Sequence, residues 1–209
     1  TLAEENTSLG DSAGTKISGI PMKTTDMQYR NIAVGDKFAV AIDSAGSIWS
    51  WGENAKGQLG LGDYENKVSV NRINAVYYNG FTQIAAGDNH VIALDNLGVL
   101  YAWGDNTYGQ LGKPKTTKTI NNPTVISPIS GKVVSISAGG NNTAIVDASG
   151  NVYLFGRSTN GVLRKVENIN NAVKVVTSDN YTLVLTTEGK VKMIENPSLK
   201  VTQKGNSFA

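Results

Sequence analysis

The side chains with the clearest potential for catalysis are one histidine and a set of aspartates. His90 is the single histidine of the chain and follows Gly87-Asp-Asn. As a general base it would need a nucleophile or a carboxylate that the fold brings within hydrogen-bond reach. The chain repeats itself, as described below, and the positions equivalent to His90 are Phe38, Asn142 and Tyr181, which share no chemistry with it. We therefore expect His90 to be structural and the chain not to be an enzyme.

The aspartates follow the same spacing. Asp43, Asp95 and Asp147 lie 52 residues apart, and each precedes a glycine by a few positions. Aspartate and glycine in this order are typical of tight turns, because the carboxylate accepts hydrogen bonds from the turn backbone. We expect these residues to stabilise hairpins rather than to form an acid/base pair.

Metal and cofactor sites are not predicted. A calcium loop needs several oxygen ligands at alternate positions, and Asp88-Asn-His and Asp105-Asn-Thr fall short of that pattern. The glycine-rich segment 57–62 lacks the Lys-Ser/Thr of a phosphate-binding loop. The chain contains no cysteine, which excludes disulfides, thiolate metal sites and cysteine nucleophiles. We expect no catalytic residue, no metal and no cofactor.

The composition indicates a globular chain without a strong electrostatic field. Of 209 residues, 40% are hydrophobic and 17% charged, and the net charge is +2. The densest basic stretch, residues 113–118, is shorter than a phosphate-binding footprint and is expected to be a solvated loop, so no nucleic acid is predicted as a partner. No apolar run approaches the roughly 20 residues that span a bilayer, and residues 1–6 carry no signal-peptide pattern.

The chain is an internal repeat. Trp51-Gly52 returns as Trp103-Gly104 and as Phe155-Gly156, at a spacing of 52 residues. Three series of glycines share this spacing: Gly35, Gly87 and Gly139; Gly46, Gly98 and Gly150; Gly57, Gly109 and Gly161. A fourth copy follows only 39 residues on, which places a deletion of 13 residues after Gly161. We divide the single repeat domain 1–209 into a partial blade 1–28, repeats 29–80 and 81–132, a short repeat 133–171, a partial repeat 172–198 and a tail 199–209.

Each unit reads as short antiparallel strands. The runs 38–42, 91–94 and 143–146 are too short for helices, are rich in β-branched residues and are bordered by Gly, Asn and Asp. The outer segments around 68–73 and 123–129 offer a fourth strand. We predict an all-β fold of β-propeller blades, each of about four strands, because one such sheet needs neighbours to bury both of its faces. About four units, partial at both ends, give an open arc or a ring closed by oligomerisation.

The segments 51–60 and 103–112 resemble the Trp-Gly-x-Asn-x-x-Gly-Gln-Leu-Gly repeat of the regulator of chromosome condensation family, and the resemblance extends over residues 29 to 164. It implies the blade of a seven-bladed propeller, here a bacterial-type member or a fragment of one. The copy that begins at Phe155 lacks the Trp, the Gln and the final Gly. The motif itself is expected to be scaffold, with Trp or Phe filling the space between blades and Gln58 and Gln110 bonding to the backbone. The resemblance also implies a turn-stabilising role for His90.

Strand parity predicts where a partner would bind. If strands alternate in direction, the first and third turns of each blade open on one face and the aspartate turns on the other. Aromatic and polar groups held on rigid turns are typical of recognition surfaces. The predicted binding face consists of Asp36, Lys37, Phe38, Asp88, Asn89, His90, Asn106, Tyr108, Asn141, Asn142, Asp179, Asn180 and Tyr181.

Two classes of function follow from this organisation, and a third is weighed because of the family resemblance. The first is a non-enzymatic protein–protein interaction module, bacterial and either secreted or at the cell surface. The second is a structural unit whose unpaired blade edges complete a propeller with another chain, including a second copy of itself. The third alternative is a nucleotide-exchange-type regulator of a small GTPase. It is the weakest, because no residue of this sequence can be matched to that activity in the family.

Overall fold

The computed structural model describes residues 28–74, 80–196 and 198–203 of the chain. These residues form four antiparallel sheets of four strands, each in the order of the chain. The predicted all-β blades of about four strands are therefore confirmed. The predicted partial blade 1–28 lies, except for its last residue, outside the described residues.

The strands have the following bounds. The first sheet contains β1 (Tyr29–Val34), β2 (Phe38–Asp43), β3 (Ile48–Gly52) and β4 (Lys67–Arg72). The second contains β5 (Phe81–Ala86), β6 (His90–Asp95), β7 (Leu100–Asp105) and β8 (Thr119–Ile126). The third contains β9 (Val133–Gly139), β10 (Asn142–Asp147), β11 (Val152–Gly156), a 3-10 helix η1 (Arg157–Thr159) and β12 (Arg164–Lys165). The fourth contains β13 (Ala172–Thr177), β14 (Tyr181–Thr186), β15 (Val191–Glu195) and β16 (Lys200–Gln203).

The two irregular units differ in how they accommodate their shorter sequence. In the third sheet the 13-residue deletion reduces the outer strand β12 to two residues, whereas β8 has eight. In the fourth sheet β16 pairs with β15 along four residues. This strand corrects two expectations. The fourth unit was expected to be partial and to end at residue 198, but it has a fourth strand, and residues 200–203, expected to be tail, form that strand.

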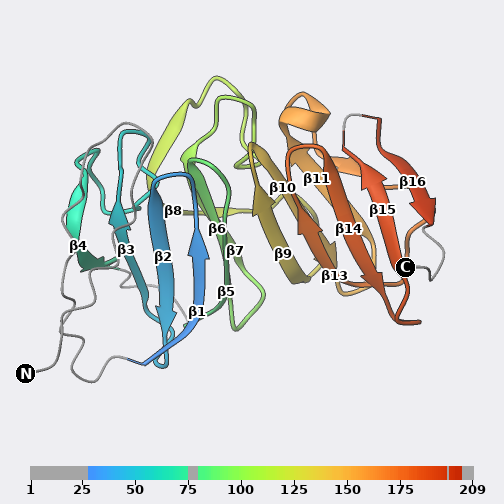
Figure 1. Cartoon of the computed structure of the whole chain (residues 1–209), viewed down its shortest axis with the longest axis horizontal. Helices are drawn as coiled ribbons and strands as arrows, with labels where there is room; N and C mark the ends of the chain where they lie inside the picture. The colour runs from blue at the N-terminus through green and yellow to red at the C-terminus, as the bar shows by residue number, and fades with distance from the viewer. Residues whose placement is uncertain (1–27, 75–79, 197, 204–209) are drawn as a thin grey trace, which may run out of the picture.

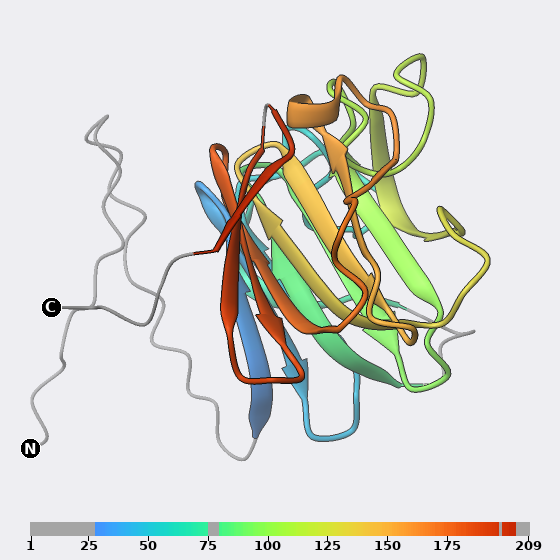
Figure 2. The same cartoon turned by 90° about the vertical axis from the view of Figure 1, so that its right-hand side faces the viewer.

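The four sheets lie side by side in chain order, from β1–β4 at one end to β13–β16 at the other (Figure 1). Figure 2 looks along this row from the β13–β16 end, and the sheets overlap as successive layers. The first strands β1, β5, β9 and β13 of consecutive sheets contact one another, so they form the inner edge of the row. Each sheet face that meets a neighbour is thereby removed from water.

Three apolar clusters fill the three spaces between sheets. In the first, Trp103 of β7 packs among residues of β2, β3 and β5; in the second, Phe155 of β11 packs among residues of β6, β7 and β8. Both aromatic side chains are fully buried. The third cluster joins the third and fourth sheets through Leu154, Val175 and Ile194. The expected role of the Trp or Phe as interblade filler is confirmed at residues 103 and 155.

Within the described ranges, no helix is long and apolar enough to cross a membrane.

Candidate interaction face

The first and third turns of every sheet lie on the same edge. In each sheet the residue that leaves the third strand donates its backbone N–H to a carbonyl in the turn between the first and second strands. These bonds run from Glu53 to Lys37 (2.9 Å), from Asp105 to Asn89 (2.8 Å), from Arg157 to Asn141 (2.9 Å) and from Asn196 to Asn180 (2.8 Å). We call this edge, with its first and third turns, the turn face.

Neighbouring first turns are bonded to one another along the turn face. The backbone N–H of Asp36 donates to the Asp88 carbonyl at 3.0 Å, and that of Asp88 donates to the Gly140 carbonyl at 2.8 Å. The backbone N–H of Asn141 donates to Oδ1 of Asp179 at 3.3 Å. The turns of all four sheets therefore form one continuous row that is held in place before any partner arrives.

The third sheet carries glycine where the others carry aspartate. Gly140 is equivalent to Asp88 and has a φ of 54°. A Cβ atom on Gly140 would lie only 1.9 Å from Oδ1 of Asp179. The glycine thus leaves room for the Asp179 carboxylate, which lies against this part of the row. Three carboxylates, Asp36, Asp88 and Asp179, follow the inner side of the turn face.

These carboxylates influence one another electrostatically. Partial burial, followed by the charges of Asp179 and Asp36, raises the pKa of Asp88. A shallow hollow of about 250 Å³ lies beside the row, lined by Val34, Gly35 and Asp36 of the first sheet and by the equivalent segments 86–88 and 139–140. The lining of the hollow contains glycines and the two carboxylates Asp36 and Asp88 but no basic residue, which favours a positively charged ligand group. No group of three histidine, aspartate or glutamate side chains in the described part of the chain is arranged to hold a metal ion.

The outer part of the turn face is aromatic and basic. The Arg157 guanidinium lies over the Tyr108 ring, 5.5 Å from its centroid. The ammonium of Lys115 donates to Oδ1 of Asn160 at 2.6 Å. Tyr108 and Arg157 are both exposed, so this pair offers a preformed aromatic and cationic contact beside the acidic row.

Three residues predicted for the binding face point away from it. Phe38, His90 and Asn142 begin the second strands and are 4%, 0% and 1% exposed. Side chains alternate along a strand, and this first position points toward the next sheet rather than out of the turn. Tyr181 holds the same position in the fourth sheet, which no described sheet follows, and is 48% exposed. The expectation of exposed contact side chains is therefore corrected at the three buried positions.

Asn106 is also buried, for a different reason. Its amide nitrogen donates to the carbonyls of Lys113, Pro114 and Thr117, and its oxygen accepts from the backbone N–H of Leu111. The side chain therefore holds the long outer connection of the second sheet together. Its role is internal, and its predicted place on the contact surface is corrected.

The other predicted members are partly or fully accessible on the turn face: Asp36, Lys37, Asp88, Asn89, Tyr108, Asn141, Asp179, Asn180 and Tyr181.

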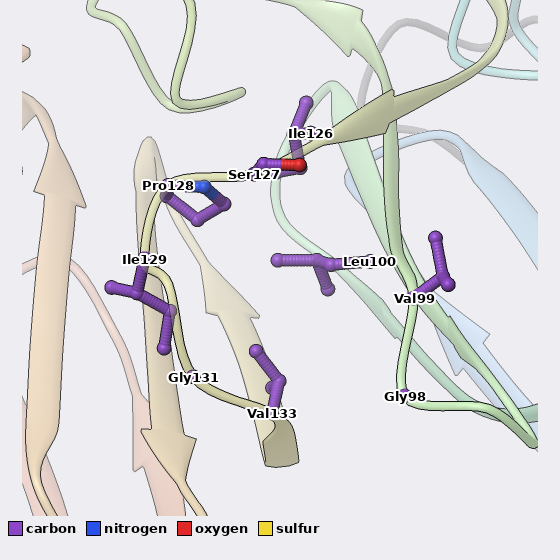
Figure 3. A pocket seen from close by; sticks show the side chains of 9 residues that line it. All are labelled: Gly98, Val99, Leu100, Ile126, Ser127, Pro128, Ile129, Gly131 and Val133. Atoms are coloured by element: carbon purple, nitrogen blue, oxygen red, sulfur yellow. The ribbon is translucent and has the colours of Figure 1, made fainter.

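A second pocket lies at the opposite edge. It has a volume of about 160 Å³ and lies between the start of β7 and the segment that joins β8 to β9. Figure 3 shows that its side chains are aliphatic, among them Leu100, Ile126 and Val133, with Pro128 and Ser127 at one side. No titratable side chain lines it, so it offers no acid–base or metal-binding chemistry.

Family models match the segments that contain the repeated motif. One model of the Regulator of chromosome condensation (RCC1) repeat matches residues 45–94 and 98–146, and a second matches residues 29–58 and 81–110. The matched segments together run from residue 29 to residue 146, more than half of the chain. The chain belongs to the regulator of chromosome condensation repeat family.

Individual proteins match this chain over part of their length. The ultraviolet-B receptor UVR8 of Arabidopsis thaliana is 31% identical over 158 residues, which are 76% of this chain and 36% of UVR8. The crystal structure of human WBSCR16 superposes with a TM-score of 0.74 at 22% identity, covering 83% of this chain and 49% of that one. Prp20p from Saccharomyces cerevisiae, whose structure was described together with its binding to Gsp1p and histones, gives a TM-score of 0.67 at 20% identity over 80% of this chain and 44% of its own. The chain thus spans about half or less of these relatives.

The Gln of the regulator of chromosome condensation repeat bonds to the backbone, as expected. Oε1 of Gln58 accepts from the N–H of Lys56, and Oε1 of Gln110 accepts from the N–H of Tyr108, both at 2.8 Å. The carbonyl of Gln58 in turn accepts from Nε1 of Trp103 at 2.9 Å. This bond ties the first sheet to the repeat Trp of the second.

Where Phe155 replaces the repeat Trp, a threonine takes over this bond. The side chain of Phe155 has no N–H group, and Oγ1 of Thr143 donates to the Gln110 carbonyl at 2.7 Å instead. Nε2 of His90 lies 2.9 Å from the same Oγ1. Since the hydroxyl has already donated its proton to Gln110, it must accept from His90, which assigns the proton of the imidazole to Nε2. Sequence reasoning missed this contact because Thr143 has the apolar Val91 as its equivalent in the preceding unit.

The imidazole of His90 is enclosed on its other side. Nδ1 has no hydrogen-bond partner, and a Cβ atom on Gly87 would lie 2.5 Å from it, so the ring rests directly on the turn glycine. Burial lowers the pKa of His90 to about 4, although the charge of Asp105 partly opposes this effect. A neutral, fully buried imidazole that donates to a hydroxyl already bonded to a backbone carbonyl holds the two sheets together.

The repeated aspartates act in the turns of the opposite edge. Oδ1 of Asp147 accepts from the backbone N–H groups of Ser149 and Asn151, both at 2.9 Å, and Oδ2 accepts from the Asn151 amide and the Tyr153 hydroxyl. Burial would raise the pKa of Asp147, but these hydrogen bonds outweigh it and lower the pKa. In the fourth sheet the equivalent residue is Thr186, which makes the same turn with a hydroxyl.

This difference gives a testable substitution. Asp147→Thr should lower the free energy of unfolding at pH 7 by about 2 kcal/mol, because bonds to a charged acceptor are replaced by one neutral bond. The folded pKa of Asp147 lies below its unfolded value, so the wild-type advantage is present above the unfolded pKa near 4 and is lost as the pH falls through the folded value. Urea unfolding at pH 7 and near pH 3 measures both. An equal loss at the two pH values would contradict the assigned role of the charge.

Proposed function

We propose that this chain is a non-enzymatic protein-interaction module that binds another protein through the turn face. The observation that carries the proposal is the row of first turns, which are bonded from sheet to sheet and present Asp36, Asp88 and Asp179 on one rim. Ordering these side chains costs little on binding, because the backbone bonds have already fixed the turns. Membership of a repeat family whose relatives bind proteins supports the same reading.

The charge of the rim indicates the chemistry of the partner. Two carboxylates, Asp36 and Asp88, line a shallow hollow that has no basic residue in its lining, and the Asp179 carboxylate lies against the same row of turns. A lysine or arginine from a partner would satisfy them, and the raised pKa of Asp88 would fall again on contact, so binding and ionisation favour each other. We infer that the partner offers a basic segment to the inner rim, while Tyr108 and Arg157 supply contacts farther out.

Purified core histones are a suitable basic probe, since Prp20p was described with its binding to histones. The triple variant Asp36→Asn, Asp88→Asn and Asp179→Asn should weaken histone binding on the order of tenfold or more, measured by biolayer interferometry, because three charged contacts are lost. A matched control combines Glu167→Gln with Glu188→Lys, at two exposed carboxylates that lie outside the first and third turns. It raises the net charge by the same three units away from the turn face.

The two variants separate the possible outcomes. Loss of binding only in the turn-face variant supports the proposal. Equal loss in both variants would reduce the interaction to net charge, and no effect in either, or no binding by the wild type, would contradict it. Gsp1p, the other protein described with Prp20p, serves as a second probe for the alternative of a small-GTPase regulator.

A bacterial origin and a secreted or cell-surface location stay predictions, the location resting on a lysine content that is low relative to Asn, Thr, Ser and Gly.

A further inference from the structure

The outer face of the first sheet has the residues of an interblade interface but lies in water. Ile84, Ile136 and Val175 occupy equivalent positions on the first strands of the later sheets and are 7%, 8% and 2% exposed, because each packs on the preceding sheet. Their equivalent in β1 is Ile32, which is 68% exposed. Val34 beside it is 64% exposed. This face, which also carries Trp49 and Trp51 on β3, is called the leading face.

The outer face of the fourth sheet likewise exposes apolar residues whose equivalents in the preceding sheet are buried. In the third sheet Ala144, Val146 and Val152 are fully buried against the fourth sheet. Their equivalents 39 residues on are the exposed apolar residues of what we call the trailing face: Leu183 at 45%, Leu185 at 38% and Val191 at 43%. Val176 and Tyr181 extend this face and are 55% and 48% exposed.

Both the leading face and the trailing face expose large apolar side chains to solvent. Stacked repeats bury such apolar sheet faces against a neighbour, and an apolar face left in water promotes association. Here the trailing face is at least as apolar as its buried counterparts, because Leu183 and Leu185 stand where the third sheet has Ala144 and Val146. The open surface is moreover a sheet face rather than a strand edge, since β16 completes the fourth sheet.

The two faces are complementary by the rule of the internal interfaces. In all three internal interfaces, one sheet contributes aliphatic side chains of its second and third strands. The next sheet packs on them a β-branched residue of its first strand and a bulky side chain of its third strand. The leading face supplies this set with Ile32, Trp49 and Trp51. The fitting occupant for each face is therefore the other one, which a single chain cannot bring together because they lie at opposite ends of the row (Figure 1).

We propose that the trailing face of one copy docks on the leading face of a second copy, so that two chains associate head to tail. This inference goes beyond the proposed function, since it concerns the ends of the row and leaves the turn face free. A head-to-tail contact forms a closed ring when its rotation closes and a filament when it does not. A two-chain ring would satisfy all four exposed faces and limit assembly to twice the 22.1 kDa of the chain.

Light scattering after size exclusion tests the association over a concentration series. The wild type should reach the mass of two chains. Ile32→Lys on the leading face and Leu183→Lys on the trailing face should each lower the average mass toward one chain, because each buries a charge at both contacts of the ring. Leu97→Lys is the matched control, since Leu97 is 62% exposed in the turn between β6 and β7 and lies on neither face. Circular dichroism checks that every variant keeps its strands.

Mixing the two face variants tests the head-to-tail arrangement itself. The Ile32→Lys chain retains an intact trailing face and the Leu183→Lys chain an intact leading face, so an equimolar mixture should recover a two-chain species held by one contact. A wild type that stays at 22.1 kDa at every concentration would overturn the proposal. The proposal would also be overturned if the two face variants kept the wild-type mass, or if their equimolar mixture had no higher average mass than the separate variants.

Discussion

Thr143→Val is expected to lower the free energy of unfolding by about 3 kcal/mol, although valine has nearly the same shape as threonine. The substitution leaves the Gln110 carbonyl and the Nε2–H of His90 without a partner, and both residues are fully buried. A buried polar group without a partner costs roughly 1–3 kcal/mol, and two such groups add up to this value. Urea unfolding followed by circular dichroism measures the change.

The preceding interface provides the control for this prediction. There the three positions are Phe38, Val91 and Trp103, and the Trp indole bonds to the Gln58 carbonyl. Combining Thr143→Val with His90→Phe and Phe155→Trp should therefore recover most of the lost stability, since it installs the chemistry of one interface in the other. Gly112 leaves room for the larger ring, because its nearest Phe155 atom would be 3.5 Å from an added Cβ. A triple variant less stable than Thr143→Val would show that the two interfaces are not interchangeable.

Acidification should destabilise the protein through His90 before it affects the carboxylates. The folded pKa of His90 is about 4, against about 6.5 when unfolded. The unfolded chain binds more protons between these values, so the stabilising contribution is complete above pH 6.5 and is lost as the pH falls toward 4. The shift corresponds to about 3 kcal/mol. Unfolding curves at intervals from pH 7 to pH 4 should show this loss in the wild type.

His90→Phe isolates the effect, because phenylalanine is the residue that the first sheet has at this position. The variant loses stability at pH 7 because Thr143 no longer accepts the hydrogen bond from His90, but its stability should change little between pH 6.5 and 4. Asp147→Thr should behave like the wild type in this range, since the lowered pKa of Asp147 places its effect below pH 4. If His90→Phe showed the same acid loss as the wild type, the neutral buried imidazole would be refuted.

The fold could be predicted from the sequence because its signals are local and repeated. Glycines and aspartates that recur every 52 residues mark the same turns in each unit, and the strands between them follow from their length and composition. The strand β16 could not be predicted, since Lys200–Gln203 is short and mostly polar and is ordered by its pairing with β15. Nothing in those four residues alone distinguishes them from a tail.

The meeting of the first and third turns on one edge follows from the sequence, whereas the direction of their side chains does not. Parity places the first and third turns together, and four equivalent backbone bonds confirm that they meet. The direction of a side chain at the boundary between turn and strand depends on which sheet follows, and this is not local information. His90 and Tyr181 occupy equivalent positions, yet one is fully buried and the other 48% exposed. A useful signal was the glycine three residues earlier, because Gly35 and Gly87 are each covered by the ring of Phe38 or His90.

The role of Asn106 required knowledge of the loop that it holds. An asparagine in a polar segment is compatible with an exposed turn, and only the folded connection brings the carbonyls of residues 113–117 to its amide. Asn54 holds the shorter first connection in the same way, by donating to Asp63. Two copies of one asparagine in front of the same Gly-Gln-Leu-Gly indicate a shared internal task.

Hydrogen exchange in the presence of core histones tests most directly whether this scaffold binds partners through its turn face. Binding there should slow amide exchange in the first turns 35–37, 87–89, 140–141 and 178–180, which lie in four different sheets but on one rim. Exchange in the aspartate turns of the opposite edge, such as 95–99 and 147–151, should stay unchanged. Protection confined to those opposite turns, with the first turns unaffected, would contradict the account.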